Sequence, residues 1–186
     1  MPSPSKNKGS GFEREIAKFL STLYGSTFIR APGSGAYTGG SNSHRKQVLH
    51  EGQIRTFKGD IMPPEGYTLL NAEAKFYADF GFHQLFDSSQ QIDGWLSQLL
   101  AAADPGDLNV LFMKFNRKGR YIAVVPHQEW CLDCSHFKYQ SSKHGTWLIF
   151  GLETFFDHNG TTFKKLCESK KYSKVQVENT NTIEHT

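Results

Sequence analysis

The order in which helix-like and strand-like patterns follow one another is the feature that most limits how this chain can fold. Apolar residues recur at three- and four-residue steps over 11–24 and over 88–103, which predicts two amphipathic helices. β-Branched and aromatic residues predict strands at 26–31, 56–62, 67–76, 108–115 and 120–125, with weaker candidates at 147–150 and 162–166 and a short helix at 126–134. This order predicts an α/β fold in which a mixed central β-sheet is flanked by α-helices.

Residues with special backbone preferences mark where the elements begin and end. Ser10 is expected to cap the first helix, with Glu13 at its third position as in a capping box, and Gly25 is expected to end that helix. Capping alone would explain a glutamate at position 13. The Pro-Pro-Glu-Gly sequence at 63–66 is expected to join the strands on either side of it into an antiparallel hairpin.

The length of 186 residues suits one compact domain with a short tail. We expect a single domain over 1–169, with a long basic loop at 35–58, and a flexible C-terminal tail over 170–186. No apolar run approaches the roughly 20 residues that cross a bilayer, and the N-terminus lacks the apolar core of a signal peptide. The sequence therefore predicts a soluble cytoplasmic protein with no membrane partner.

The net charge is only +3, but basic residues are concentrated in the first third of the chain. This distribution suits a phosphate-binding face, and it also suits an ordinary solvated surface. If it is a nucleic-acid-binding face, the candidate contacts include Lys8, Arg14, Arg30, Arg45, Lys46, Arg55 and Lys58.

Three cysteines without a secretory context are expected to be reduced. Cys131 and Cys134 have C-x-x-C spacing, which leaves a zinc site open as an alternative. Such a site needs two more ligands, and no second C-x-x-C or H-x₃₋₅-H pattern follows. Ordinary thiols are therefore favoured.

Asp60, Glu73 and Lys75 form the cluster with the clearest chemical meaning. Side chains two positions apart on a strand point to the same face, so Glu73 and Lys75 share a side. In a regular hairpin Asp60 would point to that side as well. Apolar neighbours surround the glutamate, and two carboxylates in such a place are costly unless they are paired or bind a cation.

Carboxylate oxygens are ligands that suit Mg²⁺, with Mn²⁺ as a substitute, and the backbone carbonyl of Ala74 could add another. A metal at this place would polarise a phosphodiester and lower the pKa of a bound water. Lys75 could hold or deprotonate that water, or offset charge in the transition state. The alternative is a structural ion pair of Lys75 with Glu73 or Asp60 on an exposed sheet face.

The neighbouring sequence resembles the PD-(D/E)XK nuclease superfamily, and within it the archaeal-type Holliday junction resolvases. The resemblance covers about 9–125. It rests on Lys8-Gly9-Ser10 before Phe12-Glu13-Arg14-Glu15, then Phe28-Ile29-Arg30-Ala31-Pro32-Gly33-Ser34-Gly35, Gly59-Asp60-Ile61, Ala72-Glu73-Ala74-Lys75, the helix from Ser88 and the strand at 110–115.

The resemblance implies a restriction-endonuclease-like core and a role for each matching residue. Asp60 and Glu73 would be the main metal ligands, Glu13 would add a ligand from the first helix, and Lys75 would be the catalytic lysine. It further implies that Arg14, Arg30 and Ser34 contact the DNA backbone. A symmetric homodimer, whose two sites cut opposed strands of a four-way junction, would match the geometry of that substrate.

The sequence departs from this family pattern in three places. Gly59 stands where a proline is usual, a change expected to be harmless. The loop at 35–58 is longer than in compact members. We interpret this loop as an added DNA contact through Arg45, Lys46 and Arg55. Long loops of this kind are also typical of virus-encoded forms. The chain beyond Val125 is also extra.

These observations predict a Mg²⁺-dependent endonuclease that resolves Holliday junctions or other branched DNA in recombination and repair. One alternative is the same site acting on another DNA substrate, by restriction-like, nicking or end-processing cleavage. Another is a non-catalytic DNA-binding module that keeps the fold. The set Glu13, Asp60, Glu73 and Lys75 argues against the last alternative, because a binding module needs no such set.

Overall fold

The computed structural model describes residues 4–31, 58–78, 80–86 and 89–168. Its helices are α1 (Pro4–Tyr24), α3 (Gln90–Ala101) and α4 (Leu152–Cys167), with a 3₁₀ helix, η2 (Phe82–Leu85). Its strands are β1 (Ile29–Arg30), β2 (Ile61–Met62), β3 (Leu70–Tyr77), β4 (Leu108–Phe115), β5 (Gly119–Val124), β6 (His136–Ser141) and β7 (Gly145–Gly151). Apart from Lys58, the expected basic loop and the expected C-terminal tail lie outside the described residues.

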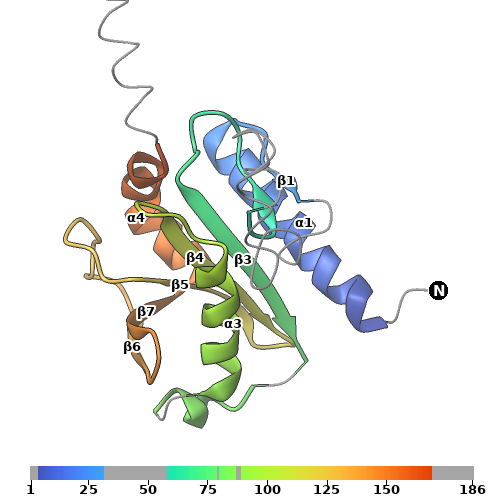
Figure 1. Cartoon of the computed structure of the whole chain (residues 1–186), viewed down its shortest axis with the longest axis vertical. Coiled ribbons are helices and arrows are strands. Elements are labelled where there is room, and N and C mark those ends of the chain that lie inside the picture. Colours follow the sequence, from blue (N-terminus) through green and yellow to red (C-terminus); the bar gives the residue numbers. More distant parts are fainter. Residues whose placement is uncertain (1–3, 32–57, 79, 87–88, 169–186) are drawn as a thin grey trace, which may run out of the picture.

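The main sheet of the described residues has five strands in the order β3-β4-β5-β7-β6. β3 and β4 run parallel, and the other neighbours pair antiparallel. Figure 1 shows α3 crossing the sheet in front and α1 lying beside β3. The prediction of a mixed sheet flanked by helices is therefore confirmed. No helix of the described residues combines the length and the apolar character that crossing a bilayer requires.

The two faces of β3 have different characters, and this difference places the polar residues. Leu70, Ala72 and Ala74 are buried in an apolar core that also contains residues of α1 and α4. The alternate face of the strand points toward α3, where the side-chain amide of Asn71 donates a hydrogen bond to the Leu99 carbonyl at 2.9 Å. Glu73 lies on this second face because side chains alternate along a strand.

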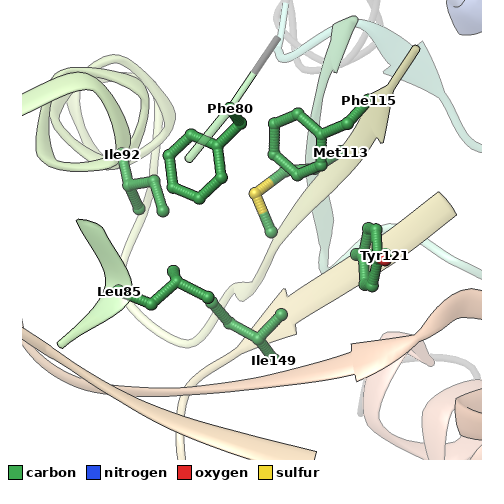
Figure 2. Close-up of a pocket in the computed structure, with 7 residues that line it drawn as sticks. All are labelled: Phe80, Leu85, Ile92, Met113, Phe115, Tyr121 and Ile149. Atoms are coloured by element: carbon green, nitrogen blue, oxygen red, sulfur yellow. The ribbon is translucent and has the colours of Figure 1, made fainter. Parts of the chain in front are cut away.

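The core between α3 and the sheet is almost completely filled. It leaves an apolar cavity of about 10 Å³, which Figure 2 shows with its lining residues Phe80, Leu85, Ile92, Met113, Phe115, Tyr121 and Ile149. A space of this size holds about one water molecule, and an apolar lining offers that water no partners. The part of this face that lines the cavity is therefore packed core rather than a ligand pocket.

The expected hairpin between 56–62 and 67–76 is wrong. β2 pairs with β1 in a separate two-stranded sheet, and β3 pairs with β4 instead. Gly59 turns the chain just before β2 with a φ of +67°. Pro63 and Pro64 follow β2, and proline has no backbone N–H to donate to a ladder. The segment between turn and prolines is too short to form a long antiparallel partner for β3.

The first helix begins at Pro4, so the expected N-cap role of Ser10 is wrong. Proline is well tolerated at the first helical position, where its missing N–H would have no partner, and the polar residues that follow continue the helix. The C-terminal end is as predicted: Gly25 follows the helix with a φ of +62°. The second helix also matches, with Ser89 as its N-cap.

The C-terminal third differs most from expectation. Residues 126–134 form turns rather than a short helix, and 162–166 belong to α4 rather than to a strand. Sequence reasoning also missed β6, although Phe137 and Tyr139 alternate there with polar residues. Residues 147–150 lie in β7 as predicted. The error at 162–166 arose because a short apolar run does not by itself separate helix from strand.

Replacing Gly59 by alanine should destabilise the fold locally. A Cβ there would overlap the carbonyl oxygen of Ala72, and the positive φ adds a penalty of about 1–2 kcal/mol. Gly25→Ala is a matched control, since Gly25 has nearly the same φ and open space around it. Urea unfolding should show a larger loss of stability for Gly59→Ala than for Gly25→Ala. Equal losses would mean that the contact with Ala72 is unimportant.

Candidate functional site

Asp60 and Glu73 come together although Asp60 adjoins the small two-stranded sheet and Glu73 lies in the main sheet. Asp60 directly precedes β2, and its backbone N–H donates to the Ala72 carbonyl at 2.7 Å. Its side-chain Oδ2 accepts a hydrogen bond from the backbone N–H of Ala74 at 2.9 Å. On the other side, the carbonyl of Asp60 accepts from the backbone N–H of Ala31 at 2.9 Å. These bonds hold Asp60 against the edge of β3, at the level of Glu73.

Both acids are almost completely shielded from solvent. Asp60 is 3 % exposed and Glu73 is 1 % exposed. Burial and, to a smaller extent, the nearby Asp60 carboxylate raise the pKa of Glu73, the Lys75 ammonium lowers it, and the resulting pKa is about 7. The ammonium forms an ion pair with Glu73 Oε1. The sequence-based expectation that residues 60, 73 and 75 share one side is met by this arrangement.

The acid pair has the chemical character of a divalent cation site. Two adjacent carboxylates in a low-dielectric setting repel each other, and this repulsion helps to keep the pKa of Glu73 high. A hard divalent cation would remove the repulsion and would accept these oxygens as ligands. The residues present therefore fit a Mg²⁺ or Mn²⁺ ion that keeps several waters in its shell.

Glu13 is placed differently from the other two acids. It lies in α1, is largely buried and forms an ion pair with the guanidinium of Arg30 in β1. In the part of the chain that the structure describes, no three His, Cys, Asp or Glu side chains come close enough together to hold a metal ion. α1 packs on the face of β3 opposite to Glu73, so Glu13 would have to reach the site around the sheet edge. A metal-binding role for Glu13 stays a prediction.

The candidate DNA contacts fall into three groups. Arg14 is exposed on α1 and its guanidinium donates to Ser10 Oγ at 3.5 Å, while Arg30 is paired with Glu13. Lys58 is buried and pairs with Asp107, and with Asp104 Oδ2 at 3.2 Å. Outside the described residues lie Ser34, Arg45, Lys46, Arg55 and the side chain of Lys8.

Two residues near the site were not singled out from the sequence. Asp107, the buried partner of Lys58, follows a helix-ending Asp-Pro-Gly sequence and reads as part of a turn. Asn71 lies on the same face of β3 as Glu73 and is fully buried. Its amide group donates to the Leu99 carbonyl and to Asn109 Oδ1, whereas its own Oδ1 has no partner among the described residues. An asparagine inside a strand-like run is the signal that could have found it.

Gly59 has a more specific role than expected. Its φ of +67° is closed to proline, whose ring holds φ near about −65°. The glycine at the position of the family's usual proline therefore suits this backbone, and the expectation that the departure is harmless stays a prediction. The consequence is that Asp60 reaches β3 through a turn rather than along a continuous strand.

The cysteines show no sign of a zinc site in the described residues. Cys131, Cys134 and Cys167 are free thiols, and no metal-binding group of three side chains includes them. Burial raises the pKa of Cys134 and, more strongly, that of Cys167. Both shifts favour protonated thiols over the thiolates that bind zinc.

Comparisons with known proteins bear on the identity of this site. The family model described as "Phage putative PDDEXK endonuclease" matches residues 4–177. Searches of curated proteins and of solved structures found no match.

The metal-free protein should lose stability as the pH rises through the range in which Glu73 ionises. Because the folded state raises the pKa of Glu73 from 4.5 to about 7, the stabilisation is complete below pH 4.5 and is lost as the pH passes 7. The loss amounts to about 3 kcal/mol in this buried setting. Glu73→Gln should therefore be more stable than the parent at about pH 8 in chelator, as measured by urea unfolding.

The exposed Glu65 provides the control for this experiment. Glu65→Gln should keep the parent's dependence of unfolding free energy on pH, whereas Glu73→Gln should flatten it between pH 4.5 and 7. An unchanged slope in Glu73→Gln would show that Glu73 titrates normally.

Proposed function

Because the chain belongs to the phage putative PDDEXK endonuclease family, we propose that it is a metal-dependent DNA endonuclease whose site is built on Asp60, Glu73 and Lys75. The observation that carries this proposal is the burial of two adjacent carboxylates beside a lysine ammonium at the edge of the sheet. If the two carboxylates had only a structural role, the free-energy cost of burying them side by side would remain uncompensated. A metal-dependent nuclease, in contrast, needs both carboxylates as metal ligands.

The proposed metal is Mg²⁺, for which Mn²⁺ would substitute. Asp60 and Glu73 would bind the ion, and the carbonyl of Ala74 is a further candidate ligand. Glu13 would become a ligand if its ion pair with Arg30 were broken. When bound, the ion would polarise the scissile phosphodiester and make a coordinated water more acidic. The hard oxygen donors of the two acids support this choice.

Lys75 would act on the attacking water and on the phosphate. Its ammonium is held by Glu73 in the metal-free protein, and its side chain remains partly exposed, so it can also meet a substrate. It would orient the water during formation of the new O–P bond and offset negative charge on the phosphoryl oxygens. The attacking water would release a proton to solvent, and the leaving sugar oxygen would take a proton from solvent as the old P–O bond breaks.

We propose branched DNA as the substrate, and a Holliday junction in particular. Support comes from the resemblance to junction resolvases over 9–125. A four-way junction has two equivalent strands to cut, so a symmetric homodimer would place one site at each. The family description points to a phage protein, which would act on recombination and repair intermediates in the cytoplasm of its host.

The proposed DNA contacts are Arg14 and Arg30 in the described part, with Lys8, Ser34, Arg45, Lys46 and Arg55 outside it. Lys58 is left out because its ammonium is buried against carboxylates. Arg14 has the best access, as it is exposed on α1. Arg30 would have to share its guanidinium between Glu13 and a phosphate.

Asp60→Asn and Lys75→Ala should each lower the rate of DNA cleavage by roughly 10²-fold or more, while DNA binding persists. Asp157→Asn and Lys164→Ala are the matched controls, because both residues are exposed on α4. The measurement uses Mg²⁺ with labelled four-way junction, linear duplex and single-stranded DNA.

The pattern of products separates the candidate functions. Paired symmetric nicks on the junction alone would support the resolvase, and cutting of all forms would favour a nuclease with another DNA substrate. Binding without cleavage in both Mg²⁺ and Mn²⁺ would leave a non-catalytic DNA-binding module. Full activity of Asp60→Asn or Lys75→Ala would remove that residue from the mechanism.

Arg14→Ala should weaken DNA binding and reduce the slope of log K against log salt by about 0.9, the value for one phosphate contact. Lys138→Ala is the control, since Lys138 is exposed on β6, the strand at the opposite edge of the sheet from β3. Binding is measured in chelator by fluorescence anisotropy over a salt series. A slope unchanged by Arg14→Ala would mean that α1 does not contact the backbone.

A further inference from the structure

Lys58 lies two residues before Asp60, and its charge is buried rather than offered to a ligand. The side chain is 7 % exposed, and its ammonium pairs with the carboxylate of Asp107, which is itself 3 % exposed. A second contact at 3.2 Å reaches Asp104 Oδ2. A lysine that bound a DNA phosphate would need solvent access and would not already be neutralised by two acids.

Asp107 is tied to the start of both parallel strands. It directly precedes β4, and the next residue, Leu108, donates its backbone N–H to the Leu69 carbonyl at 2.8 Å. The Asp107 carboxylate also accepts from the backbone N–H of Asp104 at 2.6 Å, which closes the turn after α3. The Lys58–Asp107 ion pair therefore connects the segment before Asp60 to the body of the main sheet.

Asp60 depends on this connection because β2, the strand that follows it, is not part of the main sheet. β2 is two residues long and pairs with the equally short β1. Asp60 itself contacts β3 through a hydrogen bond that its backbone N–H donates to the Ala72 carbonyl and one that its carboxylate accepts from the Ala74 N–H. Between Lys58 and Asp60, Gly59 passes close to the Ala72 carbonyl. Loss of the ion pair would release the N-terminal side of this turn.

We propose that Lys58 is a positioning residue, whose ion pair with Asp107 holds Asp60 beside Glu73 and so sets the affinity of the acid pair for a divalent cation. The link to a cation rests on the proposed function, whereas the positioning of Asp60 does not. Partners that orient metal ligands in this way typically contribute 10- to 100-fold to metal affinity.

The test compares three single variants of the full chain and the double variant that combines Lys58→Met with Asp107→Asn. Lys58→Met keeps most of the side-chain length and removes the charge, and Asp107→Asn keeps the partner's shape and removes its charge. Lys165→Met is the matched control, because Lys165 forms an exposed ion pair with Glu129 on another part of the molecule. Mn²⁺ binding without DNA is measured by electron paramagnetic resonance, and hydrogen exchange of the segment at 58–62 is measured in chelator.

Lys58→Met and Asp107→Asn should each weaken Mn²⁺ binding by about tenfold or more. They should also speed exchange at 58–62, and the double variant should be no worse than either single one because both remove the same interaction. DNA affinity in chelator should stay within about twofold of the parent. Lys165→Met should change none of these quantities. If Lys58→Met does not fold, Asp107→Asn carries the same expectations.

Two results would overturn the proposal. Unchanged Mn²⁺ affinity and exchange in the folded variants would show that Asp60 is positioned without the ion pair. Weaker DNA binding with a reduced salt slope in Lys58→Met, but normal Mn²⁺ affinity, would make Lys58 a DNA contact. If the parent itself binds no Mn²⁺, the proposed metal site fails, and the exchange at 58–62 still decides whether Lys58 positions Asp60.

Discussion

The enforced closeness of two buried carboxylates, those of Asp60 and Glu73, is the constraint on which the organisation of the site depends. Burial raises the pKa of Glu73, and the neighbouring Asp60 carboxylate adds to that rise. The surrounding structure offsets only part of the cost of burying these two carboxylates. The Ala74 amide donates to Asp60, and Lys75 pairs with Glu73. A divalent cation would complete this compensation, which is why a site that is unfavourable for folding is well suited to metal-assisted chemistry.

The sheet makes this closeness possible by separating apolar from polar side chains along β3. One face of the strand buries Leu70, Ala72 and Ala74 against α1 and α4, so the strand is firmly held. The other face carries Asn71 and Glu73, and the edge of the strand remains available for the turn that brings in Asp60. A rigid strand thus supplies one acid and the lysine, while a short, separately anchored segment supplies the other acid.

Much of the site could be read from the sequence because it depends on local rules. The period of two along a strand places Glu73 and Lys75 on one side without knowledge of the fold. Helical spacing found α1 and α3, and the run at 108–115 matches β4. The failures have physical causes as well. The hairpin failed because Gly59 takes a positive φ, and β6 was missed because it has only two large apolar residues, too short an alternation to stand out.

The sequence by itself determined which residues are chemically able to form the site and that Glu13 lies on a helix and Glu73 and Lys75 on one strand, since residue type and periodicity are local properties. The sequence did not determine which strands and charged side chains pair with each other across the fold. Only the tertiary structure decided that β3 pairs in parallel with β4, that Glu13 is paired with Arg30, and that Lys58 is buried against Asp107. Such pairings join residues far apart in the chain, and their burial and electrostatic energies depend on the whole packed arrangement, so no local pattern encodes them.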